Sequence, residues 1–76
     1  MSLYLINDNI NSFDYVIAHL CKVVPMCNTL RAEQMARLVH ESGECHIHSG
    51  FPPEMYIIYA QLQKAGLTVK LKIDKK

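Results

Sequence analysis

The stretch Leu3-Tyr4-Leu5-Ile6-Asn7-Asp8-Asn9 decides the fold, because it joins four apolar residues directly to three polar ones. Four apolar residues bounded by a turn signal are typical of a short buried strand. The Asn-Asp-Asn run predicts a turn, since Asx side chains hydrogen-bond their own backbone and tolerate unusual backbone angles. The sequence therefore predicts a short buried strand that ends at a polar turn.

Length and composition predict one small globular domain. The chain has 76 residues, of which 50% are hydrophobic and 20% charged, and its formal net charge is +1. A chain of this size buries only ~60% of its unfolded surface, enough for one core. No apolar run approaches the ~18 residues needed to span a bilayer, and no basic flank precedes an apolar segment as in a signal peptide. We therefore expect a single cytoplasmic domain over residues 1–76, with no membrane partner.

The lysines do not indicate a nucleic-acid partner, and the cysteines do not indicate a disulfide or a zinc site. Lysines on a strand edge more often prevent edge pairing than bind phosphate, so no nucleic-acid partner is expected. They gather at the C-terminus as Lys70, Lys72, Lys75 and Lys76. The three cysteines match no disulfide framework and no CxxC zinc spacing. For Cys21, on the apolar side of a predicted helix, a reduced core thiol is expected.

Two helices are predicted after the polar turn. Asn11 or Ser12 can cap the first, which must end before Pro25 because a residue preceding proline leaves the helical region. Its apolar face is Phe13, Val16, Ile17, Leu20 and Val24. Asn28 or Thr29 can cap the second, which should run to about Ser42, with Gly43 following its C-terminus. Its apolar members are Leu30, Ala32, Met35, Ala36, Leu38 and Val39. His40 lies one turn beyond Ala36 on the same side.

The second half of the chain predicts a strand, a helix and a strand. Residues 44–50 alternate, with Cys45 and Ile47 on one face and Glu44, His46 and His48 on the other. Pro52-Pro53-Glu54 opens a third helix, which Gly66 ends. Its apolar stripe is Met55, Ile58, Tyr59 and Leu62. The last strand alternates Leu67, Val69, Leu71 and Ile73 with polar residues.

The predicted order is strand, helix, helix, strand, helix, strand. One three-stranded antiparallel sheet with three helices on one face gives a compact α+β sandwich, which is the predicted fold class.

Several runs of residues together resemble the ClpS adaptor family. They are Ile6-Asn7-Asp8-Asn9, then Phe13-Asp14-Tyr15-Val16 and Leu20, then Ala32-Glu33-Gln34-Met35-Ala36-Arg37-Leu38-Val39-His40 and Gly43. The specific part is the combination of Asn-Asp after the first strand with Val-His at the end of the second helix. The same element order belongs to ClpS proteins and to the related C-terminal domain of the ribosomal stalk protein. The resemblance covers nearly the whole chain and is strongest through Gly43.

The resemblance implies an adaptor that hands substrates with a destabilising N-terminal residue, or N-degron, to a ClpA- or ClpC-like AAA+ unfoldase and its protease. Asn7, Asp8 and His40 would hold the free α-amino group of the substrate. The pocket for its first side chain would be lined by Phe13, Val16, Ala36, Val39 and Leu67. No catalysis and no cofactor are implied, and we expect a monomer.

The chemistry of these residues suits that ligand. An α-ammonium carries three donors and a positive charge, so it needs closely grouped acceptors, one of them preferably anionic. Asp8 supplies the charge, Asn7 a neutral carbonyl and neutral His40 a further lone pair. An apolar hole beside them would bury a Leu or Phe side chain, worth roughly 1.5–3 kcal/mol. Both parts are needed for binding, and this gives a small site its specificity.

Each of these residues also has a purely structural interpretation. Asn7 and Asp8 could only shape the turn, and His40 could be a helix-terminal cation favoured by the helix dipole. Phe13, Val16 and Val39 could be ordinary core residues. The order and spacing of all these residues together favour the binding site over the purely structural interpretation.

The sequence departs from the family in its pocket. Many members carry Met where this chain has Ala36, and that side chain walls the pocket against β-branched residues. Alanine predicts a roomier pocket that admits Ile or Val besides Leu, Phe, Tyr and Trp. A second Asp and a Thr are often found where this chain has Asn9 and Asn11, so the site is less acidic.

The residues for delivery depart further. The family usually has a flexible N-terminal extension, which here is absent or truncated, since only Met1 and Ser2 precede the strand. In the family, a Glu and a Lys near the third helix contact the unfoldase; the aligned residues here are Pro53 and Ile58. Glu54 is adjacent and could replace the Glu, whereas Ile58 cannot replace a lysine.

Two other interpretations of the sequence are a metal site and a catalytic site. His46 and His48, with Glu44 beside them, could chelate zinc or copper from one strand face, although no fourth ligand is evident. Asp8 and His40 resemble a catalytic dyad, but no serine or cysteine stands in the context of an activated nucleophile, and the glycines form no phosphate loop.

A generic interaction domain is the remaining alternative. It would have the same fold, a collapsed pocket and a partner on an outer helix face. Solvent-facing Tyr56 and Ile57 would favour it. An open cavity lined by Phe13, Val16, Ala36 and Val39 would favour the N-degron site instead.

Overall fold

The central strand of the protein is β1 (Ser2–Ile6), which pairs with both other strands. The structure is a computed structural model, and it describes residues 1–8 and 10–73. β2 (Glu44–Ser49) and β3 (Val69–Lys72) flank β1 in the order β2-β1-β3, and both pairings are antiparallel. The apolar stretch at the start of the chain is thus the middle of the sheet.

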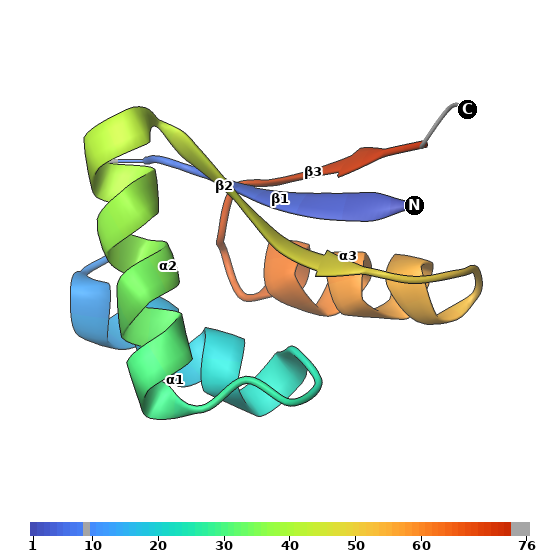
Figure 1. Ribbon diagram of the computed structural model, residues 1–76, viewed down its shortest axis with the longest axis horizontal. Helices are drawn as coiled ribbons and strands as arrows, with labels where there is room; N and C mark the ends of the chain where they lie inside the picture. The colour runs from blue at the N-terminus through green and yellow to red at the C-terminus, as the bar shows by residue number, and fades with distance from the viewer. Residues whose placement is uncertain (9, 74–76) are drawn as a thin grey trace.

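Three helices lie on one side of this sheet (Figure 1). They are α1 (Phe13–Val23), α2 (Thr29–Ser42) and α3 (Glu54–Lys64). Of these, α2 and α3 pack against the strands of the sheet, and α1 packs mainly against these two helices. The order β-α-α-β-α-β and the α+β class are confirmed. Among the described residues, no helix is both long and apolar enough to cross a membrane.

Local signals set the helix ends where the sequence predicts them. The Ser12 side chain accepts a hydrogen bond from the Tyr15 N–H, and the Asn28 side chain accepts one from the Arg31 N–H, so both are N-caps. Gly43 follows α2 with φ of 91°, a left-handed angle that costs glycine little.

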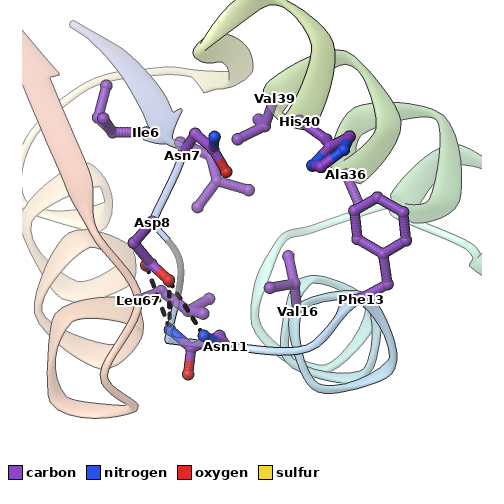
Figure 2. A pocket seen from close by; sticks show the side chains of 11 residues that line it. Ile6, Asn7, Asp8, Asn11, Phe13, Val16, Ala36, Val39, His40 and Leu67 are labelled. Atoms are coloured by element: carbon purple, nitrogen blue, oxygen red, sulfur yellow. Dashed lines mark hydrogen bonds between the residues drawn. The ribbon is translucent and has the colours of Figure 1, made fainter.

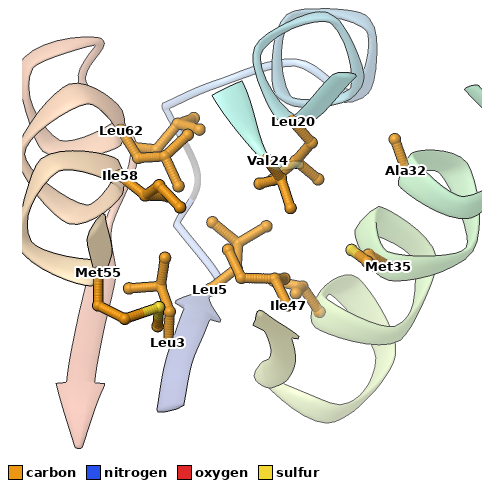
Figure 3. Packing of buried hydrophobic residues seen from close by; sticks show 12 residues of the cluster. Leu3, Leu5, Leu20, Val24, Ala32, Met35, Ile47, Met55, Ile58 and Leu62 are labelled. Carbon is orange, nitrogen blue, oxygen red and sulfur yellow. The ribbon is translucent and has the colours of Figure 1, made fainter. Parts of the chain in front are cut away.

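The core lies between the sheet and the helices (Figure 3). Leu3 and Leu5 of β1 and Ile47 of β2 point into it, where they meet side chains from all three helices. The other buried members are Leu20, Val24, Ala32, Met35, Val39, Met55, Ile58, Leu62 and Leu67. Fully burying one such large side chain stabilises the fold by roughly 1.5–3 kcal/mol.

Some predicted apolar positions are not in the core. Leu30 and Leu38 of α2 are 65% and 49% exposed, because they turn to the outer face of that helix. The last strand is shorter than predicted: Leu67 precedes it and is buried, whereas Ile73 follows it and is 73% exposed. Alternation in a sequence cannot tell where pairing with β1 stops, since that depends on the length of the partner strand.

The two histidines of β2 do not share a face, so that prediction was wrong. A register shift between Leu3 and Tyr4 pairs Leu3 with His48 and Tyr4 with His46. Paired residues lie on the same face of a sheet, and Leu3 and Tyr4 point to opposite faces. The bulge therefore turns His48 toward the helix side of the sheet, while His46 packs on the Tyr4 ring at a centroid distance of 5.4 Å.

The lysines of β3 decorate an edge strand, as expected. Lys70 is exposed, and the Nζ of Lys72 lies 4.5 Å from the centroid of the Tyr4 ring on the open face of the sheet. Lys75 and Lys76 lie outside the described residues.

Candidate functional site

A cavity of about 330 Å³ opens where the end of β1 meets the start of α1, the last turns of α2 and the segment before β3 (Figure 2). All eight residues proposed for the amino group and the pocket line this cavity: Asn7, Asp8, Phe13, Val16, Ala36, Val39, His40 and Leu67. Leu5, Ile6 and Asn11 complete the lining. The volume is near the small end of the ~300–1,000 Å³ that is usual for ligand pockets.

Two backbone hydrogen bonds hold the polar turn at the mouth of the cavity. The Asn7 N–H donates to the Gly43 carbonyl at 2.8 Å, which ties the turn to the end of α2. The Ile6 N–H donates to the Thr68 carbonyl at 2.9 Å, which ties it to the segment leading into β3. Segments distant in sequence are thereby joined around one opening.

The wall of the cavity is apolar, and the side chains that line it do not fill the cavity. Ala36, Val39 and Leu67 are 3%, 5% and 3% exposed, and Val16 is half-buried. Their side chains point toward the open space between α1, α2 and the polar turn (Figure 2). The cavity is therefore open rather than collapsed.

Phe13 and His40 form one side of the rim. Their rings meet edge to face, with centroids 5.4 Å apart and planes at 82°. Phe13 is 48% exposed and His40 is exposed, so both are accessible from the cavity mouth. Phe13, the first residue of α1 and one of the residues predicted for the pocket, borders the opening.

The Asp8 carboxylate is fully occupied by hydrogen bonds from its own surroundings. Its Oδ1 accepts the N–H groups of Ile10 at 3.0 Å and Asn11 at 3.1 Å, as in an Asx turn. The Asn11 Nδ2 donates to Oδ1 at 3.3 Å and to Oδ2 at 3.2 Å, and the Thr68 hydroxyl donates to Oδ2 at 3.2 Å. Desolvation acts to raise the pKa of Asp8, but these hydrogen bonds outweigh it, and its pKa lies below the usual value.

Asn7 and His40 contrast with Asp8. Within the described part of the chain, neither side chain makes a hydrogen bond, and both are exposed at the cavity mouth. The Asn7 carbonyl and a ring nitrogen of neutral His40 are thus acceptors available to a bound molecule.

Asn11 was predicted as a possible helix cap and as a position where the family often has Thr, and it also lines the cavity. Besides its contacts to Asp8, its Nδ2 donates to the Gly66 carbonyl at 3.0 Å, so it links the polar turn to the end of α3. The spacing Asp8-x-x-Asn11 was the available signal for its contact with Asp8. Asn9, where the family often has a second Asp, lies outside the described residues.

Comparison with known proteins shows the family of the chain. The family described as "ATP-dependent Clp protease adaptor protein ClpS" matches residues 1–70. The chain belongs to the ClpS family. A similar curated protein is the ATP-dependent Clp protease adapter protein ClpS of Thermosynechococcus vestitus, which is 32% identical over 65 residues, covering 86% of this chain and 69% of the relative. ClpS proteins are adaptors of the Clp protease, so the chain is a member of an adaptor family.

The start of α3 lies away from the cavity of this ClpS-family chain. Glu54, the candidate unfoldase contact, is the first residue of α3, and its Oε1 lies 3.3 Å from the Nε2 of His48. Tyr56 and Ile57 on the same helix are 51% and 54% exposed. The exposure of Tyr56 and Ile57 favours an interaction surface on α3, and the open cavity favours a binding site at the end of β1. The structure has both features.

The histidines of β2 have other partners. The His46 Nε2 is 2.6 Å from the Ser49 Oγ, and His48 contacts Glu54. No group of three or more His, Cys, Asp or Glu side chains within residues 1–8 and 10–73 is arranged to hold a metal ion. The cysteines are all half-buried and free, and burial raises the pKa of Cys27 and Cys45.

Proposed function

We propose that this chain binds the N-terminal residue of N-degron substrates in the cavity at the end of β1. The carrying observation is that Asn7 and His40, whose acceptors no described residue uses, lie beside an open apolar wall of Ala36, Val39 and Leu67. The α-ammonium of the substrate would meet the polar end, near the charge of Asp8. The first side chain would enter the apolar part.

Each half of this site selects one chemical feature. An ammonium needs acceptors and negative charge, which an acetylated N-terminus cannot use because it has lost its charge. A bulky apolar side chain gains roughly 1.5–3 kcal/mol by burial, which a polar or small side chain does not. Together they would recognise a free N-terminus that begins with Leu, Phe, Tyr or Trp.

The test uses paired fluorescent peptides that begin with Leu and differ only in N-acetylation. We expect anisotropy to report binding of the free peptide and a loss of at least about tenfold on acetylation, since a charge-assisted hydrogen bond is worth roughly 1.5–3 kcal/mol. Equal binding of the two peptides, or binding of neither, would refute the proposed site.

The cargo would pass to a ClpA- or ClpC-like AAA+ unfoldase. Family membership supports this step, and exposed Glu54 is the candidate contact on α3. Degradation of a Leu-initiated reporter by the unfoldase and its protease, with and without this chain, measures delivery. A Glu54→Lys variant should bind the peptide normally and lose delivery; loss of both activities would contradict the assignment.

A second candidate function is a protein-interaction domain that does not deliver to Clp. The exposure of Tyr56 and Ile57 favours it. It predicts that a Tyr56→Ser, Ile57→Ser variant loses a protein partner while unfoldase-dependent degradation is unchanged.

A further inference from the structure

The hydrogen bonds of Asp8 point to a role that differs from direct ligation of the ammonium. A carboxylate offers about four lone-pair sites. The donors from Ile10, Asn11 and Thr68 already use both oxygens of Asp8. A substrate ammonium could bond this carboxylate only by displacing one of them, whereas Asn7 and His40 have acceptors that no described residue uses.

We infer that Asp8, Asn11 and Thr68 form a tie that positions the site, while Asn7 and His40 contact the substrate amino group directly. This inference rests on the proposed function and concerns the same cavity. Asp8 adds negative charge near the substrate amino group, but its hydrogen bonds are made to groups of the protein itself. Asn11 and Thr68 become positioning residues, and Thr68 was not placed in the site from sequence.

The tie joins the two halves of the binding site. Asp8 belongs to the polar turn that carries Asn7, and Thr68 follows Leu67, which forms part of the apolar wall. The hydrogen bond from the Thr68 hydroxyl to the Asp8 Oδ2 spans 60 positions of sequence, and that from Asn11 to the Gly66 carbonyl spans 55. The tie therefore sets how far the acceptors for the amino group lie from the pocket for the side chain.

The sharpest test removes a donor to Asp8 and leaves its charge in place. Thr68→Val deletes one hydroxyl and keeps the shape of the side chain. Binding is measured for a Leu-initiated peptide and for its desamino analogue, which keeps the side chain and lacks the amino group. If the tie positions Asn7, Thr68→Val weakens the amino peptide by about threefold to tenfold, because fewer molecules hold the competent geometry.

Two controls belong to this test. Binding of the desamino peptide should change by less than about twofold, which shows that the fold and the pocket are intact. Thr68→Ser restores the hydroxyl and should restore binding of the amino peptide.

The opposite result identifies direct ligation. If Asp8 is itself a ligand of the ammonium, Thr68→Val frees a lone pair on Oδ2, and the amino peptide binds equally well or more tightly. That outcome overturns the inference and leaves the proposed function standing. Equal binding of the amino and desamino peptides by the wild-type chain overturns the proposed function itself, and with it the inference.

A measurement on the unmodified chain covers the case in which the variant does not fold. NMR spectra of the wild-type protein follow the Asp8 carboxyl carbon and the Asn7 side-chain amide during addition of the peptide. The tie predicts a large shift for Asn7 and a small one for Asp8. A dominant shift at Asp8 would contradict it.

Discussion

The cavity and the outer surface of α3 both expose apolar residues, but they differ in how those residues are held. At the cavity, apolar groups lie beside a polar turn that hydrogen bonds fix to the ends of α2 and α3. On α3, Tyr56 and Ile57 are exposed on a helix face, and the neighbouring Glu54 meets only a half-buried histidine. Recognition of a small ligand needs grouped, positioned acceptors; of these two regions, as far as the described residues go, the cavity has them and the α3 surface does not.

The largest expected effect comes from filling the cavity. Ala36→Phe places a ring in the space that we propose for the first side chain of the substrate, and we expect peptide binding to weaken by about 100-fold or more, since the burial of roughly 1.5–3 kcal/mol is lost and a clash is added. Ala60→Phe, on the exposed part of α3, is the matched control and should bind normally. Anisotropy measures binding, and a thermal melt confirms that both variants fold. Unchanged binding by Ala36→Phe would place the ligand elsewhere.

A smaller effect should follow from the shape of the first side chain. Because Ala36 leaves the wall open, an Ile-initiated peptide should bind within about 100-fold of its Leu counterpart, since the placement of one methyl group costs only ~1–3 kcal/mol. A Leu-to-Ile difference above that limit would show that another residue closes the pocket. The same anisotropy assay, with a Val-initiated peptide added, measures the limit.

The hydrogen bonds of Asp8 should also make the stability of the fold depend on pH. Because hydrogen bonds hold the pKa of Asp8 below its usual 3.8, the unfolded chain takes up a proton at a higher pH than the folded chain. The stability from these bonds is present above about pH 3.8 and is lost as the pH falls through the folded pKa. Urea melts at a series of pH values should show this loss for the wild type and a reduced loss for Asp8→Asn. An identical pH profile for both chains would mean that the carboxylate is not stabilised in the fold.

The smallest expected effect on peptide binding comes from the α3 surface. Tyr56→Ser and Ile57→Ser remove exposed side chains far from the acceptors, so stability should change by less than about 0.5 kcal/mol and peptide affinity by less than about twofold. Delivery to the unfoldase is measured in parallel with the Leu-initiated reporter. A loss of peptide binding would show that the two regions are coupled.

The local features of the fold could be predicted from sequence because each depends on neighbouring residues. Ser12, Asn28 and Gly43 mark helix ends through contacts within one turn of chain. The eight proposed site residues were grouped by resemblance to a family, and the structure places them around one cavity. Their roles in binding stay predictions until the peptides are measured.

The sequence by itself determined the element order, the helix boundaries and the residue types of the site. Only the tertiary structure decided the bulge that separates His46 from His48, the outward turn of Leu30 and Leu38, and the meeting of Asp8 with Thr68. Periodicity predicts which residues share a face of an isolated element, but it carries no information on register or on which face finds a neighbour. Those depend on contacts between segments far apart in the chain, and the hydrogen bond from Thr68 to Asp8 is such a contact.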